Sequence, residues 1–487
     1  MKELIEKYVE EHLPEMIEDL KAMCRIDSVR TDPVEGAPFG PGPLMALNAA
    51  SDLSEKYGLK ITDYDNFART ADLCPEGEAA LDILAHVDVV PAGDGWTETK
   101  PFEPVLKDGR VYGRGCADDK GGFIASLYAM RAVKELGIPI SRRCRLIIGC
   151  AEETGMEDVT HYFETEKPAP MTVSPDAFYP VINVEKGRVA VSYDAIFPAS
   201  NSKRRLVSLE GGIAINQVPA SATAVVMGVM AADIAEEEHI TRDTEAHTFT
   251  VTYEYEDVAM MTMDTGVSFV FEEIEGGLRI YANGLAAHAS TPEKGHNAVI
   301  ALAELIHRLE LDPSGGLKIL DDYICFYSSG EYYGFLSNMY AEDEVSGKTT
   351  CAPDILRITE TSFHAEVDYR TACCADEMDI EEALSAVADD LGALLTITDK
   401  VSSHIVPKDS EFVRTLLECY EEATGEKGEC ISMGGSTYVH EIEGGVAFGH
   451  LPADEDVHEH GPNEYMPVEY LKKTAVIYAL SIAKLCK

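Results

Sequence analysis

The sequence has no long apolar run and few positive charges. No segment reaches the ~18 consecutive apolar residues of a membrane-spanning helix, and the charged start MKELIEKYVEEHLPEMIEDL does not resemble a signal peptide. Lysine and arginine number 40 against 86 aspartate and glutamate residues, so the formal net charge is −46. Nucleic acid and anionic membrane both bind clustered Lys and Arg, and the composition therefore argues against either partner.

Cysteines are sparse and show no pairing pattern. The 12 cysteines in 487 residues include no CxxC pair. Disulfide frameworks use dense, regularly spaced cysteines, so we expect reduced thiols and a cytoplasmic protein. HExxH, GxSxG and P-loop motifs are also absent, which leaves the simplest hydrolase and phosphate-binding hypotheses without support.

The chain is long enough for two or three domains. In residues 1–186, two buried strand patterns flank a helical pattern that ends in glycine, which is typical of an α/β domain. From 187 to 402, alternating strand patterns and separate helical stretches indicate an α+β domain. The α/β character resumes in 403–487. The sequence therefore predicts an α/β domain, 1–186 with 403–487, into which the domain 187–402 is inserted.

Metal-binding residue types gather at the predicted strand ends, where open α/β sheets place their sites. His86 and Asp88 alternate at the end of the strand pattern LDILAHVDVV, so both side chains leave one face. Asp118 and Asp119 lie in a glycine-rich turn before a helix, where an N-cap would need only one of them. Further donors follow along the chain: Glu152, Glu153, Asp176, His458 and His460. Carboxylates and imidazoles suit zinc, with manganese or cobalt as substitutes.

The adjacent Glu152 and Glu153 allow two interpretations. Two neighbouring carboxylates repel each other and are costly to desolvate. Either they mark a solvated loop after the strand pattern CRLIIGC, or one binds a metal while the other handles a proton.

Longer stretches of the chain resemble a known enzyme family. HVDVVPAGDGWTETKPFEPVLKDGRVYGRGCADDKGG resembles the signature segment of the aminoacylase and carboxypeptidase G family of dinuclear zinc peptidases. AEETG, SPDAFYPVINVEKG, GGIAINQVPASA, GGSTY and HGPNEY follow in the order of its PepV-type dipeptidases. The resemblance implies an α/β zinc-peptidase catalytic domain, a mixed sheet flanked by helices. It also implies an inserted α+β lid domain of two ferredoxin-like halves, which we expect to divide near residue 270.

The resemblance also implies a ligand set for two Zn²⁺ ions, with Mn²⁺ or Co²⁺ as substitutes. His86, Asp118 and Asp176 would hold one ion. Asp118 would bridge to a second ion, completed by Glu153 and His460. Asp118 is assigned this role because the family's bridging aspartate lies two residues before a lysine.

The same resemblance suggests how the reaction proceeds. Asp88 would hydrogen-bond the second ring nitrogen of His86 and fix its tautomer. Glu152 would be the general base, and adjacent side chains of an extended segment point opposite ways, so Glu153 can face the metal. The family pattern also predicts a cis peptide bond after Asp118.

The inserted domain would supply residues that touch the substrate. His288 resembles the lid histidine that donates to the developing oxyanion. Asn216 and Arg370 match substrate-contacting lid positions, with Arg370 clamping a C-terminal carboxylate; a salt bridge along its strand is the alternative. The backbone N–H groups of Gly434, Gly435 and Ser436 would bind the same carboxylate. The alternative is that this loop is only a tight turn.

The sequence therefore predicts a metal-dependent dipeptidase that cleaves dipeptides with a free N-terminus. An N-acyl-amino-acid amidohydrolase of the same family is the alternative, and an inactive metal-binding homologue is a more remote one. Relatives with a short lid dimerise and exchange their lid histidines. The insertion 187–402 is nearly twice a small domain's size, so we expect a monomer.

Overall fold

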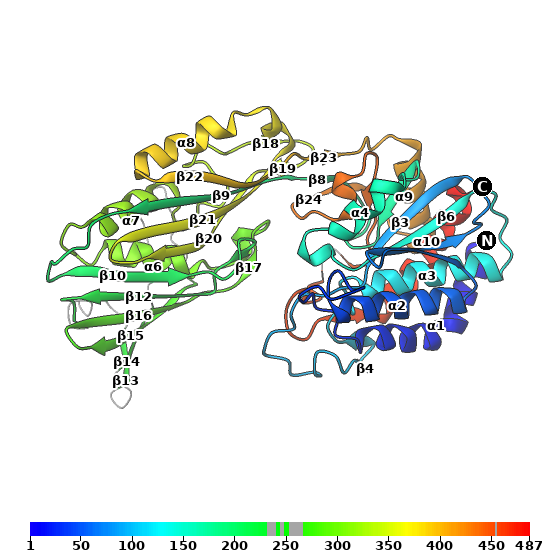
Figure 1. The fold of residues 1–487 in the computed structure, drawn as a ribbon, viewed down its shortest axis with the longest axis horizontal. Coiled ribbons are helices and arrows are strands. Elements are labelled where there is room, and N and C mark those ends of the chain that lie inside the picture. Colours follow the sequence, from blue (N-terminus) through cyan, green and yellow to red (C-terminus); the bar gives the residue numbers. More distant parts are fainter. Residues whose placement is uncertain (231–239, 244–247, 253–265, 453–454) are drawn as a thin grey trace. The chain divides into compact units, whose positions relative to one another are not determined.

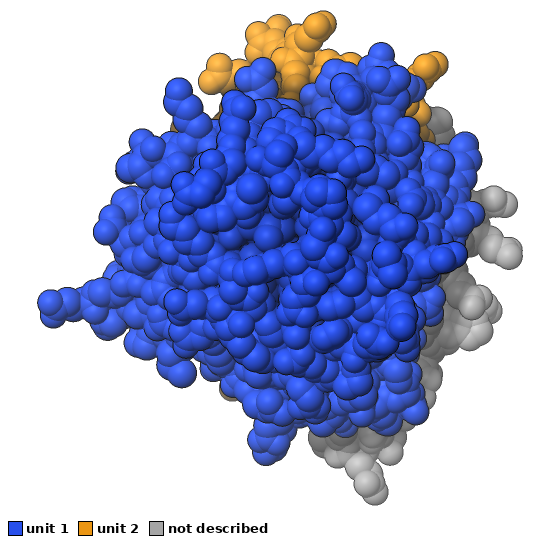
Figure 2. Space-filling model, turned by 90° about the vertical axis from the view of Figure 1, so that its right-hand side faces the viewer, with its two compact units in different colours: residues 1–185, 404–487 blue, residues 186–403 orange. Residues whose placement is uncertain are grey.

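The computed structural model describes residues 1–230, 240–243, 248–252, 266–452 and 455–487, with the backbone alone for 240–243 and 248–252. The chain forms two compact units, residues 1–185 with 404–487 (unit 1) and residues 186–403 (unit 2), shown in Figures 1 and 2. These limits lie within one residue of the domain boundaries expected from the sequence. Among the described residues, no helix is both long and apolar enough to cross a membrane.

Unit 1 is built around a nine-stranded mixed sheet with the order β1-β2-β6-β3-β7-β25-β8-β23, in which β24 also pairs with β8. Its strands are β1 (Lys60–Tyr64), β2 (Ala68–Leu73), β3 (Ala79–His86), β6 (Arg143–Gly149), β7 (Met171–Ser174), β8 (Val181–Glu185), β23 (His404–Ile405), β24 (Cys430–Met433) and β25 (Val446–Ala447). The neighbours β6, β3 and β7 run parallel, so their carboxyl ends meet at one edge of the sheet.

Both faces of this sheet are covered, which explains the apolar runs in its central strands. Leu81 and Ile83 belong to the larger core, whereas Leu84 lies in a smaller apolar cluster, because alternate side chains leave opposite faces. The larger core is formed with α1 (Lys2–Cys24), α2 (Pro41–Lys56), α3 (Lys120–Glu135), α9 (Glu411–Thr424) and α10 (Val468–Leu485). The smaller cluster is formed with α4 (Glu157–Thr165) and the 3₁₀ turn η4 (Tyr438–Glu441).

A separate three-stranded sheet in unit 1 has the order β26-β5-β4. It consists of β4 (Val105–Lys107), β5 (Arg110–Tyr112) and β26 (Tyr465–Pro467). The pairing of β5 with β26 brings the GRGCADD turn, which follows β5, close to the HGPNEY segment, which ends in β26.

Unit 2 contains a ten-stranded antiparallel sheet with the order β13-β14-β15-β16-β12-β10-β20-β21-β9-β22. Its strands are β9 (Gly187–Ile196), β10 (Arg205–Gly211), β12 (Ser221–Met227), β13 (Ile240–Asp243), β14 (Thr248–Thr252), β15 (Ser268–Ile274), β16 (Gly277–Asn283), β20 (Thr350–Ile358), β21 (Ser362–Thr371) and β22 (Leu394–Val401). Its core also includes residues of α6 (Ala298–His307), α7 (Gly315–Phe326) and α8 (Ile380–Leu391).

The expected division of unit 2 near residue 270 is wrong. The first strand of the unit, β9, pairs with the late strands β21 and β22, whereas β15 and β16 join the early strand β12. Each set of strands is therefore assembled from both sides of residue 270. An alternating pattern identifies a strand but carries little information about its partner, and sequence neighbours are sheet neighbours only in part.

Candidate metal centre

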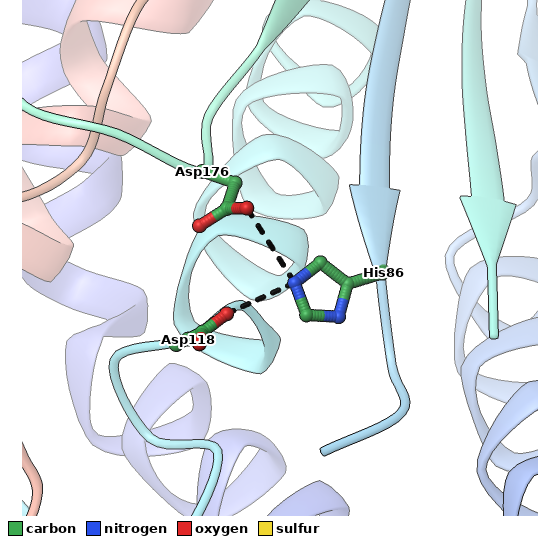
Figure 3. Close-up of side chains that lie close together, drawn as sticks. All are labelled: His86, Asp118 and Asp176. Carbon is green, nitrogen blue, oxygen red and sulfur yellow. Dashed lines mark ion pairs between the residues drawn. The ribbon is translucent and has the colours of Figure 1, made fainter. Parts of the chain in front are cut away.

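His86 ends β3 and faces two carboxylates (Figure 3). Its Nε2 atom lies 2.9 Å from Oδ1 of Asp118 and 3.6 Å from Oδ2 of Asp176. Asp118 precedes α3, and Asp176 follows β7 by two residues. The His86 side chain is fully buried, yet neither ring nitrogen makes a well-directed hydrogen bond to any described residue. Buried polar atoms are normally satisfied, and this donor set fits a divalent cation.

A second group of donors shares Asp118 with the first. His460 Nε2 lies 2.8 Å from Oδ2 of Asp118 and 3.2 Å from Oε2 of Glu153. In each group, one ligand atom per residue lies within 4.8 Å of the others. The two oxygens of Asp118 thus face different histidines, which is the arrangement of a bridging carboxylate. The structure brings together all five residues that the sequence suggests as ligands.

The backbone at Asp118 is held by a buried ion pair. The peptide bond between Asp118 and Asp119 is cis, as the family resemblance predicts. Glu464 Oε1 accepts the N–H groups of Ala117 at 2.9 Å and of Asp118 at 3.3 Å. Glu464 Oε2 pairs with Arg114 at 2.5 Å, and both side chains are buried. Glu464 lies in the HGPNEY motif, but no local signal in the sequence distinguishes it as a functional residue.

Asp88 connects the first histidine to the glutamate pair. One of its oxygens lies 3.3 Å from Nδ1 of His86. Its two oxygens also accept the backbone N–H groups of Glu152 at 3.3 Å and Glu153 at 3.2 Å. Asp88 is 1% exposed; it holds the backbone of the glutamate segment, and one of its oxygens lies within ion-pair distance of the His86 ring.

The glutamate pair does not lie on an extended segment, and that part of the sequence interpretation is wrong. Glu152 to Thr154 form a 3₁₀ turn that begins three residues after the end of β6. The backbone N–H groups of both glutamates donate to Asp88, and these hydrogen bonds account for the turn. A 3₁₀ helix has three residues per turn, so successive side chains still diverge, by about 120°. The Glu153 side chain is 6% exposed, and Glu152 is half-buried.

Several carboxylates lie close together in the site, and burial and their mutual repulsion shift their pKa values. Burial raises the pKa of Glu152 well above its usual value, although the charge of His86 acts in the opposite direction. Burial and the charge of Asp118 raise the pKa of Glu153 to about 7. Burial also acts to raise the pKa of Asp118, but His460 and His86 hold it well below its usual value. A bound cation would relieve the repulsion among these carboxylates.

Comparison with known proteins assigns the chain to a family. A sequence model of "Peptidase family M20/M25/M40" matches residues 83–484. The chain belongs to this peptidase family. "Putative dipeptidase YtjP" of Bacillus subtilis (strain 168) is 34% identical over 97% of this chain and 97% of its own. "Beta-Ala-Xaa dipeptidase" of Lactobacillus delbrueckii subsp. lactis is 29% identical, covering 97% of this chain and 96% of its own.

Solved structures of M20 peptidases share the fold. Human carnosine dipeptidase 1 has a TM-score of 0.58 at 16% identity and covers 99% of both chains. The dipeptidase Dug1p of Saccharomyces cerevisiae has a TM-score of 0.56 at 12% identity, again over 99% of both chains. The predicted family and the predicted α/β fold with an inserted domain are confirmed.

The inserted unit of this M20 peptidase brings its three suggested substrate residues close to one another. The short strands β11 (Gln217–Val218) and β17 (Ala287–His288) pair, and the N–H of Ala289 donates to the carbonyl oxygen of Asn216 at 2.9 Å. The hydroxyl of Thr350 donates to the carbonyl oxygen of Ala289 at 3.4 Å, and Thr350 lies opposite Arg370 in the sheet. Asn216, His288 and Arg370 thus lie in one region of unit 2.

Side-chain contacts in unit 2 specify how two of these residues can act. Nδ1 of His288 lies 3.1 Å from the backbone nitrogen of Ser290 and 2.7 Å from its hydroxyl oxygen, so Ser290 holds this side of the ring. Arg370 is buried, and its Nε and one terminal nitrogen donate to Asp368 at 2.8 and 3.1 Å. The salt bridge considered as the alternative for Arg370 is therefore present. Because a guanidinium has five N–H donors, this pair does not use all of them.

The GGSTY loop connects β24 to η4 in unit 1. Ser436 is exposed, whereas Thr437 and Tyr438 are buried. Glu185 accepts both the N–H of Thr437 at 3.2 Å and its hydroxyl at 2.8 Å. Sequence reasoning did not find Glu185, since its pattern is that of an ordinary buried strand.

Proposed function

We propose that this peptidase is a metal-dependent dipeptidase that hydrolyses the peptide bond of dipeptides with a free N-terminus. The main observation in support is the position of Asp118, whose two carboxylate oxygens face His86 and His460 beside the glutamate pair. The names of the relatives from Bacillus and Lactobacillus support a dipeptide substrate. All twelve cysteines are free thiols, which supports the cytoplasmic location expected from the sequence.

The proposed cofactor is a pair of Zn²⁺ ions, for which Mn²⁺ or Co²⁺ could substitute. His86, Asp118 and Asp176 would hold one ion, and Asp118, Glu153 and His460 the other. Three carboxylates and two imidazoles are suitable ligands for these metals. A dinuclear centre supplies a nucleophilic water at neutral pH and polarises the scissile carbonyl.

The residues of the chain would then move the protons and hold the substrate. Glu152 accepts the proton of the attacking water and returns it to the leaving amine. His288 donates a hydrogen bond from Nε2 to the oxygen of the scissile carbonyl, where negative charge develops in the transition state. Asn216 and Arg370 contact the substrate, with Arg370 binding its carboxylate. The same carboxylate would receive backbone N–H groups from Gly434, Gly435 and Ser436.

A substrate panel separates this proposal from deacylation. The purified chain, supplied with zinc or manganese, is assayed on dipeptides and on the matching N-acetyl amino acids. We expect cleavage of the dipeptides and little or none of the N-acetyl compounds, because a dipeptidase site must accommodate a free amine. The reverse preference would establish the amidohydrolase, and Glu152→Gln serves as the inactive control for both reactions.

A further inference from the structure

Two buried aspartates hold the backbone that leads to the proposed base. The N–H groups of Cys150 and Ala151 donate to Oδ2 of Asp158 at 2.6 and 2.7 Å. The next two N–H groups, those of the glutamate pair, donate to Asp88. Four consecutive backbone donors are therefore fixed by two carboxylates. Asp88 also contacts His86, whereas Asp158 connects the segment to another part of unit 1.

Asp158 makes this second connection through a tyrosine. The hydroxyl of Tyr438 donates to Oδ2 of Asp158 at 2.6 Å, and both side chains are buried. The other oxygen of Asp158 accepts the N–H of Val159 at 2.8 Å, which fixes the carboxylate at the start of α4. The ring of Tyr438 meets the ring of His86 edge-on, with centroids 6.2 Å apart. One carboxylate oxygen thus links the base segment to the loop that contains residues 434–438.

The close approach of these groups depends on Gly149 at the end of β6. A Cβ atom at Gly149 would lie 2.1 Å from the hydroxyl oxygen of Tyr438 and 2.5 Å from Oδ2 of Asp158. Both separations are far below van der Waals contact. A glycine is thus needed where the Tyr438–Asp158 hydrogen bond passes over the strand.

The loop is held on its other side by a different carboxylate. Glu185, the last residue of β8, accepts two hydrogen bonds from Thr437 and lies 2.9 Å from Nδ1 of His440. Because Glu185 and Asp158 hold neighbouring residues of one loop, the loop has little freedom to shift. Of the two, Asp158 is the carboxylate that joins the loop to the base segment.

We propose that Asp158 and Tyr438 are positioning residues that align the Glu152 segment with the 434–436 loop. This inference rests on the proposed roles of Glu152 as the base and of residues 434–436 in binding the substrate carboxylate. A general base must lie about 2.6–3.2 Å from the proton that it removes, and a displacement of ~1 Å can cost ~100-fold in rate. The base and the carboxylate-binding loop act on opposite parts of one small substrate. A direct link between them keeps both at the spacing that the substrate requires.

The test compares Tyr438→Phe with Tyr162→Phe. Both tyrosines are buried in the same apolar cluster. The hydroxyl of Tyr162 makes no hydrogen bond within the described part of the chain, so its removal is the matched control. We expect Tyr438→Phe to lower kcat for a dipeptide about tenfold, with KM within about threefold and metal content unchanged. Tyr162→Phe is expected to leave kcat within about twofold of the parent chain.

The outcomes for this inference and for the proposed function differ. If Tyr438→Phe matches Tyr162→Phe in kcat while Glu152→Gln is inactive, the positioning role is refuted and the dipeptidase function stands. If the parent chain cleaves no dipeptide, the proposed function fails, and hydrogen–deuterium exchange decides the inference. Exchange should be faster at residues 150–153 in Tyr438→Phe than in Tyr162→Phe. Equal exchange at these residues in the two variants would overturn the positioning role.

Discussion

Arg114 and Glu464 form an ion pair 2.5 Å long next to the backbone of Asp118, with side chains 1% and 0% exposed. The second oxygen of Glu464 accepts the N–H groups of Ala117 and Asp118. Removing one partner of a buried pair leaves an uncompensated charge. The pair therefore connects the stability of the fold to the position of a proposed metal ligand.

Glu464→Gln is expected to destabilise the protein by about 3–5 kcal/mol and to lower its metal content. The control is Glu103→Gln, which breaks the exposed Lys100–Glu103 pair and should change stability by less than about 0.5 kcal/mol. Denaturant unfolding and elemental analysis of both variants provide the measurements. Normal metal content in a destabilised Glu464→Gln would show that the pair does not position Asp118.

The two adjacent glutamates should respond differently to the same substitution. Glu152→Gln is expected to abolish turnover and leave metal content at the parent level, because it removes only a proton acceptor. Glu153→Gln should lower metal content, since an amide is a poorer zinc ligand than a carboxylate. Elemental analysis and a dipeptide assay decide between these roles. Activity above a few per cent in Glu152→Gln would exclude it as the base.

Metal binding should weaken as the pH falls through about 7. In the metal-free site the pKa of Glu153 is raised to about 7, so below that pH the carboxyl is protonated and must lose its proton to bind metal. Treatment with a chelator should abolish activity, and added zinc or manganese should restore it. Zinc titrations of the metal-free protein between about pH 6 and pH 8, about one unit either side of that pKa, measure the dependence. Glu153→Gln should show a flatter profile, and an equally steep one would assign the proton to another group.

Arg370→Ala should raise KM for dipeptides at least about tenfold, because charge-assisted hydrogen bonds contribute about 1.5–3 kcal/mol. Peptides with an amidated C-terminus should be affected much less. Arg188 is the matched control, since its Nε also pairs with Asp368, at 3.2 Å. If Arg188→Ala raises KM equally, or if Arg370→Ala affects both kinds of substrate alike, Arg370 acts through the strand salt bridge and does not bind the carboxylate.

The sequence predicted the parts of the molecule that have local signals. His86, Asp118 and Asp176 follow apolar strand patterns or a glycine-rich turn, and parallel strands bring such ends together without further information. The hydrogen bond between Asp158 and Tyr438 has no such signal, because the two residues are 280 positions apart. The turn at Glu152 was also missed, since it depends on N–H groups bonded to the distant Asp88.

In unit 2, the strands could be predicted from the sequence, but their pairing could not. The alternating pattern SFHAEVDYR predicted a strand, and the structure has β21 at Ser362–Thr371. That β21 pairs with β9, the first strand of the unit, follows from the packing of the whole sheet and not from the pattern of either strand. Sequence reasoning therefore found the strands and misplaced the division between the two sets.

The last prediction is that one chain is the active unit. Unit 2 joins its two sets of strands into a single ten-stranded sheet through the antiparallel pair β10–β20. One chain thus already contains the doubled sheet that two shorter insertions would otherwise have to form together. In that case His288 serves the metal site of its own chain, and no exchange of histidines between chains is needed.

Dilution and mixing test this prediction. Specific activity should be constant down to nanomolar protein, because a monomer has no association equilibrium to lose. Mixing inactive Glu152→Gln with His288→Ala, which should be strongly impaired, is expected to restore nothing. If the histidine were donated in trans, a mixed dimer would contain one site with both native residues, and activity would recover toward about a quarter of the parent level for random pairing. Such recovery would refute the monomer and place His288 in the partner's site.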